Sequence, residues 1–369
     1  MSAYRTDTLA PSRRPSHPLA SHPLASIASD AHSTSAEQPF AVWPQYSNLI
    51  SRPHVGDGWP NKALGTAPPR RMRVASGISD LLARLQLRVL GLVAPQTAAR
   101  RGVDMFCTPT PNNVVDETDT AAGAQLTLLQ VDGHELAIYV WGDPQQQPYV
   151  LMTHDWSDHA LGHLAWVAAL RTAGYAVVAF DQQAHGRSSG NKATLPDFVC
   201  NLLAVGWRYG RAAAVIGHGL GGAAAAIALS HGLEADRAIL VAAHADPEDA
   251  ISRFADYMCL AGPVRRRMIA MLETRTGVEM DSLQAHRTVP KIGRPALVVH
   301  DIDDTEVPWA EGERYARYWP HARLLTTTGL GHQRIANNAQ VIASSLRFLQ
   351  GKTVGECVVS SPNLPYGLA

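Results

Sequence analysis

The chain has 369 residues, of which 46% are hydrophobic and 17% charged, a balance typical of a globular protein with enough apolar side chains for a sizeable core. Its 32 basic and 32 acidic residues cancel, which argues against a nucleic-acid partner or a bulk anionic membrane. The four cysteines form no C-x-x-C pair, and no uncharged apolar run reaches the roughly 18 residues of a membrane span. With no secretory signal at the start, we expect a cytoplasmic protein without a transmembrane segment.

Two segments precede the part of the chain that we expect to fold as a domain. Residues 1–78 hold ten of the 24 prolines and lack periodic apolar positions, so we expect a disordered N-terminal tail. The next stretch, 79–93, has one apolar helical stripe flanked by Arg84 and Arg88. Within a lead-in of residues 79–110, we expect this amphipathic helix to dock on its own domain, with a membrane surface as the alternative. The stripe consists of Leu81, Leu82, Leu85, Val89, Leu92 and Val93.

From residue 125 onward, strand and helix patterns alternate. The alternation predicts an α/β domain over residues 111–351, with a doubly wound and mostly parallel sheet. Residues 246–290 interrupt the alternation with a charged helical segment, and we expect a helical cap insert over the carboxyl edge of the sheet, where such folds bind ligands. Residues 352–369 form a C-terminal tail. The nearly continuous apolar runs that favour buried parallel strands are 149–154, 175–181, 212–217, 237–243 and 296–300.

Four groups of motifs, in a fixed order along the alternation, resemble the α/β-hydrolase superfamily. THDWSDH (153–159) stands where the oxyanion loop follows the third strand, and FDQQAHGRSSG (180–190) is similar to the family's Asp-x-x-x-His-Gly-x-Ser-x-Gly turn. IGHGLGG (216–222) resembles the nucleophile elbow. HDIDDTEVP (300–308) and GLGH (329–332) resemble the acid loop and the histidine loop. The resemblance covers roughly residues 125–350 and implies the α/β-hydrolase fold.

The resemblance also implies site residues for acyl transfer. Asp304 is implied as the acid and His332 as the base of a triad, and the backbone N–H groups of Trp156 and Leu220 are implied as the oxyanion hole. The position of the nucleophile falls on Gly219, which has no side chain. Glycine adopts the positive φ of such an elbow with little strain. The elbow is therefore expected to form while its attacking atom is missing.

The missing nucleophile decides the functional expectation. Loss of a serine nucleophile removes roughly 8–9 kcal/mol of barrier lowering, and Ser188 and Ser189 follow a different strand, where we expect them to shape a turn. We therefore favour a non-hydrolytic pseudo-hydrolase that binds a small ligand or a protein partner, comparable to the N-myc downstream-regulated family. A carbonyl or small carboxylate would suit the free N–H groups at the helix start. The alternative is a weak hydrolase of a small ester-like substrate, in which His332 and Asp304 activate a water.

Two acidic residues leave alternatives open. Asp303 adjoins Asp304 and is a rival for the acid, although spacing to the following Val-Pro pair favours Asp304. Asp155 stands where the family has glycine in the oxyanion loop, and it either points into the site, where its charge is unfavourable for acyl transfer, or faces solvent.

We expect neither a cofactor nor a metal ion. The glycines of the elbow follow the fifth strand rather than the first, unlike a dinucleotide fingerprint. The resemblance assigns fold positions to four histidines, where such side chains usually bond loop backbone. These are His154, His185, His300 and His332.

Overall fold

The computed structural model describes residues 77–110 and 123–358, and for residues 77–80 it gives the secondary structure without the side chains. The expected N-terminal tail thus lies outside the described residues except for its last two positions, and so do residues 359–369 of the expected C-terminal tail. Across the described ranges, no helix is both long and apolar enough to cross a membrane.

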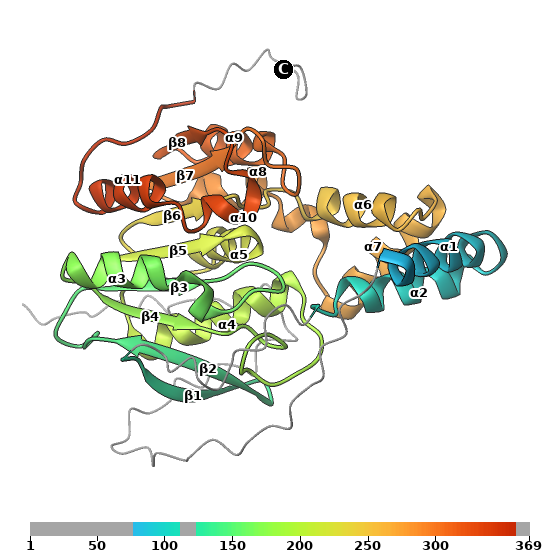
Figure 1. The fold of residues 1–369 in the computed structure, drawn as a ribbon, viewed down its shortest axis with the longest axis horizontal. Coiled ribbons are helices and arrows are strands. Elements are labelled where there is room, and N and C mark those ends of the chain that lie inside the picture. Colours follow the sequence, from blue (N-terminus) through green and yellow to red (C-terminus); the bar gives the residue numbers. More distant parts are fainter. Residues whose placement is uncertain (1–76, 111–122, 359–369) are drawn as a thin grey trace, which may run out of the picture. The chain divides into compact units, whose positions relative to one another are not determined.

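An eight-stranded sheet carries the site, with the strand order β1-β2-β4-β3-β5-β6-β7-β8 (Figure 1). β1 and β2 form an antiparallel hairpin, whose turn residues Asp132 and Gly133 have φ angles of 48° and 76°. β2 also pairs antiparallel with β4, and the remaining neighbouring pairs are parallel. The predicted α/β class with a mostly parallel, doubly wound sheet is confirmed. The strands are β1 (Gln125–Val131), β2 (His134–Trp141), β3 (Tyr149–Thr153), β4 (Ala176–Phe180), β5 (Ala214–His218), β6 (Ala238–Val241), β7 (Ala296–Asp301) and β8 (Ala322–Thr327).

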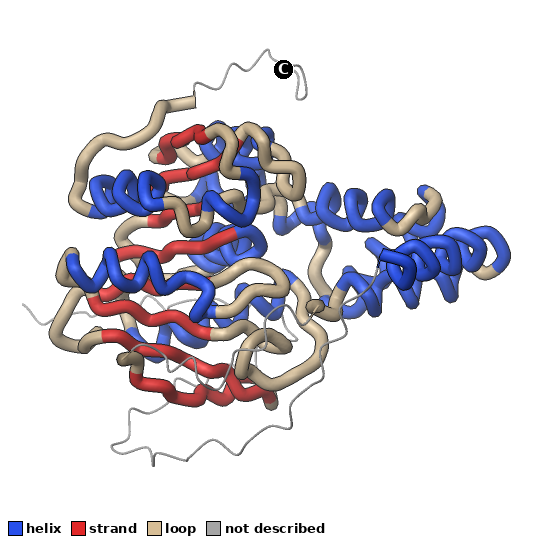
Figure 2. The backbone as a smooth tube through the Cα atoms, viewed as in Figure 1, coloured by secondary structure: helices blue, strands red, loops and turns tan. Residues whose placement is uncertain are grey.

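Helices cover both faces of the sheet, in front of and behind the strands in Figure 2. On β3, Leu151 joins the core on one face while Val150 and Met152 join the core on the other, because successive side chains of a strand alternate. Two apolar cores explain why the strands are nearly continuous apolar runs. The first core includes residues of α4 (Leu195–Tyr209), α5 (Gly219–Ser230) and α9 (Trp309–Tyr318), and the second includes residues of α3 (Leu164–Thr172) and α11 (Ala339–Leu349).

The segment 246–290 is helical, as expected, and lies between β6 and β7 in the chain. Asp246 caps its first helix by accepting a hydrogen bond from the Glu248 N–H at 2.9 Å. In Figure 1 its two long helices are grouped with α1 and α2, to the right of the sheet. The elements are α6 (Pro247–Tyr257), α7 (Gly262–Thr276), η3 (Met280–Leu283), α8 (Ala285–Thr288) and η4 (Val289–Lys291); α1 is Gly77–Val93 and α2 is Pro95–Phe106.

Helix α1 packs through a different face from the one that its sequence pattern predicts. The buried residue is Leu87, 1% exposed, which shares a core with Ala98 and Ala99 of α2. Arg84 also turns toward the domain, with its guanidinium 4.7 Å from the centre of the Tyr257 ring. The predicted docking stripe instead faces solvent, at 51–77% exposure: Leu81, Leu82, Leu85, Val89, Leu92 and Val93.

Candidate active site

The predicted elbow is a sharp turn from β5 into α5. Gly219 begins α5 with a φ of +52°, in the left-handed region that glycine adopts without strain. Glycine is also required on either side, because a Cβ at Gly217 would lie 2.5 Å from the Gly221 oxygen. A Cβ at Gly221 would lie 2.4 Å from the backbone oxygen of His154. The glycine-rich sequence thus allows the elbow to approach the loop that follows β3.

The structure brings Asp304 and His332 together. Asp304 lies in the loop after β7, and His332 lies on α10 (Gly331–Ile335), which follows β8. The His332 Nδ1 is 2.8 Å from Asp304 Oδ2, while Asp304 Oδ1 accepts hydrogen bonds from the backbone N–H groups of Glu306 and Val307. Asp303, the rival for the acid, accepts instead from the Gly329 N–H at 2.7 Å. Of the two neighbouring carboxylates, only that of Asp304 is hydrogen-bonded to the imidazole.

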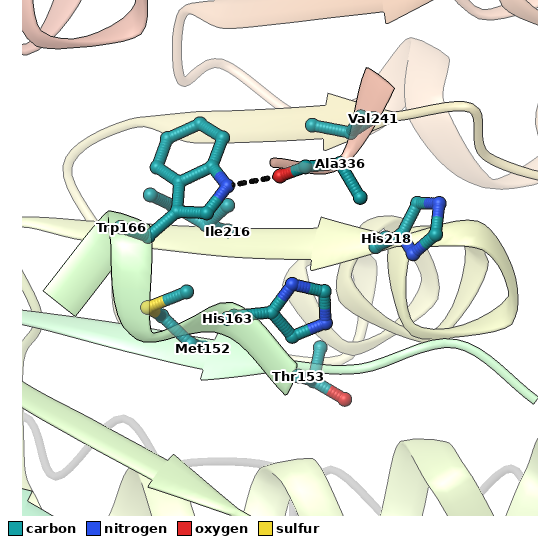
Figure 3. A pocket seen from close by; sticks show the side chains of 8 residues that line it. All are labelled: Met152, Thr153, His163, Trp166, Ile216, His218, Val241 and Ala336. Carbon is teal, nitrogen blue, oxygen red and sulfur yellow. Dashed lines mark hydrogen bonds between the residues drawn. The ribbon is translucent and has the colours of Figure 1, made fainter. Parts of the chain in front are cut away.

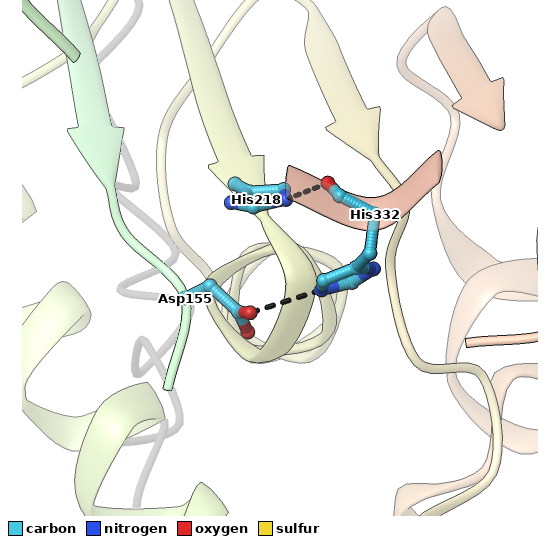
Figure 4. Close-up of side chains that lie close together, drawn as sticks. All are labelled: Asp155, His218 and His332. Atoms are coloured by element: carbon cyan, nitrogen blue, oxygen red, sulfur yellow. Dashed lines mark hydrogen bonds and ion pairs between the residues drawn. The ribbon is translucent and has the colours of Figure 1, made fainter. Parts of the chain in front are cut away.

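Asp155 points into the site, which answers the question left open by the sequence. Its Oδ2 is 3.0 Å from the His332 Nε2 (Figure 4), and its Oδ1 accepts a hydrogen bond from the Leu220 N–H at 2.6 Å. A Cβ built on Gly219 would lie 1.9 Å from Asp155 Oδ1 and 2.1 Å from its Cγ. The carboxylate of Asp155 therefore occupies the space that a side chain at Gly219 would need.

The implied oxyanion donors also lie beside Asp155. Leu220 directs its N–H at the Asp155 carboxylate, so this donor is already engaged. Trp156 directly follows Asp155 and is partly buried, and its ring stacks on that of Phe198 with the centroids 6.1 Å apart. A carboxylate oxygen of the chain itself thus binds the Leu220 N–H, one of the two implied oxyanion donors.

The three charged groups of this site form a buried ion triplet. Burial alone would lower the pKa of His332, but the Asp155 and Asp304 carboxylates on its two ring nitrogens outweigh burial and raise the pKa to about 10. Burial likewise opposes ionisation of Asp155, yet the hydrogen bond with His332 and the neighbouring imidazoles hold its pKa well below the usual range. Both ring nitrogens of His332 face carboxylate oxygens, an arrangement that favours the protonated imidazole.

The turn at 180–190 is a structural element. Asp181 Oδ2 accepts the Arg187 N–H at 2.8 Å, and its Oδ1 accepts the Ala160 N–H at 2.8 Å. The hydroxyl oxygens of Ser188 and Ser189 accept backbone N–H groups of β2 at 2.9 and 2.8 Å. Both serines therefore stabilise the turn, as expected, and make no hydrogen bond to His332.

A second histidine cluster beside the elbow was missed by the sequence analysis. Asp158, His163 and His218 lie close together, and His163 ends η2 (Ala160–His163). The signal was present, because His159 and His163 have the H-x-x-x-H spacing that places two side chains on one face of a helix. Of these two histidines, the cluster includes His163. The expectation that the chain binds no metal ion overlooked this spacing, and the four histidines given fold positions did not include His163.

Comparison with known proteins supports the architecture. Residues 144–301 match the sequence model of the family described as serine aminopeptidase, S33, a range that includes the elbow and Asp155 but ends before Asp304. A hydrolase from Pseudomonas aeruginosa is 22% identical, with a TM-score of 0.50, and the match covers 62% of this chain and 99% of that chain. A putative lipase from Acinetobacter baumannii is 17% identical, with a TM-score of 0.49 and coverage of 65% and 98%. No curated protein matches the chain. At 22% identity, the Pseudomonas aeruginosa structure shows a shared fold.

Proposed function

We propose that the chain, which has the α/β-hydrolase fold, is a pseudo-hydrolase of that superfamily, which binds a small molecule without serine-type acyl transfer. One observation carries the proposal: the Asp155 carboxylate has three contacts in the site. It fills the space beside Gly219, accepts the Leu220 N–H and pairs with the His332 Nε2. A serine hydrolase needs a hydroxyl, a free base and a free oxyanion donor at these three points.

The same geometry weighs against the alternative of water activated by His332. A general base must accept the proton of the water, and it must lie within hydrogen-bonding distance of it. Here the His332 Nε2 already faces Asp155 Oδ2 at 3.0 Å, and the two carboxylates hold the imidazole in its protonated form. Hydrolysis by this route would require the Asp155 side chain to swing out of the site first.

The charge of the site bears on the class of ligand. Asp155 and Asp304 contribute −2 and the His332 imidazolium +1, which leaves a net charge of −1. The N–H of Leu220, which would favour an anion at a free helix start, is already bound by Asp155. We therefore propose a neutral or cationic ligand with hydrogen-bond donors, in place of the carboxylate that the sequence pattern favours. The helical segment between β6 and β7 is proposed as the cap that shapes its binding site.

Two measurements test this function. Purified full-length protein is assayed with p-nitrophenyl acetate and butyrate and with a fluorophosphonate probe read by intact mass, beside His332→Ala. We expect the wild type to hydrolyse the esters no faster than His332→Ala and to form no covalent adduct. Hydrolysis that disappears in His332→Ala would overturn the proposal in favour of water activated by His332. A thermal-shift screen of neutral, cationic and anionic small molecules tests the ligand class, and stabilisation confined to anions would contradict it.

A further inference from the structure

The cluster of Asp158, His163 and His218 lies beside the elbow, against a small cavity. The cavity has a volume of about 10 Å³, and Thr153, His163 and His218 are among the residues that line it (Figure 3). This volume is close to that needed by one water molecule or one small ion. Both histidines are at most 5% exposed. The cluster is thus separate from the triplet of Asp155, His332 and Asp304, although His218 touches both.

One ring nitrogen of each histidine lacks the hydrogen-bond partner that a buried polar atom normally has. His218 Nε2 is 3.1 Å from the backbone oxygen of His332, and since a carbonyl oxygen only accepts, Nε2 carries the proton (Figure 4). The other nitrogen, Nδ1, therefore presents a lone pair, and it has no hydrogen-bond partner among the described residues. His163 Nε2 lies 3.1 Å from Asp158 Oδ2, but this contact does not have hydrogen-bond geometry. His218 thus has a free lone pair on Nδ1, and His163 directs Nε2 at the Asp158 carboxylate.

We propose that Asp158, His163 and His218 bind a divalent transition-metal ion of the zinc type. One ligand atom from each residue lies within 4.8 Å of the other two. The 3.1 Å between Asp158 Oδ2 and His163 Nε2 is close to the roughly 3.3 Å expected between neighbouring ligands of a tetrahedral zinc with bonds of about 2.0–2.1 Å. Two imidazoles and one carboxylate suit zinc, whereas magnesium and calcium prefer oxygen ligands alone. Three protein ligands leave a fourth position open.

The charge of the surroundings supports a divalent cation. The neighbouring ion triplet of Asp155, His332 and Asp304 has a net charge of −1. The carboxylate of Asp158 adds a further negative charge, which makes the net charge of the four groups −2. A second set, Asp155, His218 and His332, also lies within 4.8 Å. We place the ion on the first set because both ring nitrogens of His332 are already bound, by Asp155 at 3.0 Å and by Asp304 at 2.8 Å. The Nε2 of His163, by contrast, contacts only Asp158, which is itself a member of the first set.

Metal binding to the chelator-stripped full-length protein tests the inference. Zn²⁺ is titrated by calorimetry and Co²⁺ by visible absorption, where tetrahedral N/O ligation gives d–d bands without thiolate charge transfer, so binding to the exposed Cys259 or Cys357 is recognised. We expect one ion per chain. Loss of a ligand in His163→Ala or Asp158→Asn should weaken binding by more than the roughly 10–100-fold that removal of a ligand's hydrogen-bond partner costs.

His159→Ala is the matched control, since His159 lies on the same loop, is similarly buried at 8% exposure and is not part of the cluster. Its affinity should stay within about twofold of the wild type. Thermal denaturation in chelator shows whether each variant folds. If His163→Ala does not fold, Asp158→Asn still tests the inference, because the Asp158 side chain is 25% exposed. The inference is overturned if the wild type binds neither ion, if His163→Ala and Asp158→Asn bind as well as wild type, or if only Asp155→Asn loses the ion.

Discussion

Substitution of Gly219 by serine, the change that would restore a nucleophile by sequence, is expected to destabilise the protein. The new Cβ would lie 1.9 Å from Asp155 Oδ1, far inside any normal contact, so the carboxylate must leave its place. When it leaves, the Leu220 N–H loses its acceptor and the His332 Nε2 loses its ion-pair partner. The structure thus predicts that Gly219→Ser alone yields neither a stable site nor an active one.

The loss of stability in Gly219→Ser is the sum of two contributions. Breaking a buried ion pair costs about 3–5 kcal/mol. A non-glycine residue at the φ of +52° adds about 1–2 kcal/mol. The sum, about 4–7 kcal/mol, is a large part of the 5–15 kcal/mol that holds a typical domain folded, and at about 2–4 °C per kcal/mol it lowers the melting temperature by more than about 8 °C.

The double variant Asp155→Gly/Gly219→Ser removes the clash and separates this explanation from backbone strain alone. It should be more stable than Gly219→Ser by about 1–3 kcal/mol, a coupling that a double-mutant cycle in urea measures. It should also hydrolyse p-nitrophenyl acetate at least about 100-fold faster than either single variant, since a serine nucleophile accounts for up to about 2 × 10⁶ in subtilisin. Gly219→Ala serves as the control for the added Cβ. A Gly219→Ser protein with the stability of the wild type, or one that Asp155→Gly does not rescue, would refute the reasoning.

Three further predictions concern the ion triplet and helix α1. Asp304→Asn should lower the free energy of unfolding by about 3–5 kcal/mol, because it breaks a buried ion pair. Asp303→Asn, at an exposed residue, should lower it by less than about 1 kcal/mol. Urea unfolding of both variants at pH 7 measures the difference. Because the folded-state pKa of His332 is raised from 6.5 to about 10, its stabilisation is complete below about pH 6.5 and is lost as the pH rises through 10. The urea midpoint should therefore fall between pH 7 and 10.5, and less so in His332→Gln; equal slopes would contradict the raised pKa. On α1, Leu87→Ala should lower the free energy of unfolding by about 2–5 kcal/mol, and Leu85→Ala by less than about 0.5 kcal/mol. Thermal melts that give the reverse order would show that the helix docks through its predicted stripe.

Much of the fold was predictable because it rests on local patterns. The apolar run of β3 places Leu151 in one core and Val150 in the other, so burial on both faces can be read directly from the sequence. The elbow was predictable for a similar reason, since Gly217 and Gly221 are each fixed by backbone contacts that leave no space for a Cβ. Features set by neighbouring residues and by backbone geometry are therefore accessible from sequence.

Other features depended on partners distant in the chain. The direction of Asp155 is set by His332, 177 residues later, and by the Leu220 N–H, so no local pattern determines it. The docking face of α1 was predicted wrongly because leucines occur on more than one face of this helix. The choice of Leu87 follows from packing against α2, and Arg84 finds an aromatic partner in Tyr257. Tertiary contacts decided between faces that the sequence pattern alone did not distinguish correctly.

The position of the Asp155 side chain constrains the order in which substitutions could introduce a serine nucleophile. A serine that arises first meets the carboxylate and compromises folding, and a glycine that arises first at 155 removes an ion-pair partner without supplying an attacking atom. Each single substitution therefore costs stability without adding an attacking atom in an open site. A serine nucleophile at position 219 thus requires two coupled substitutions.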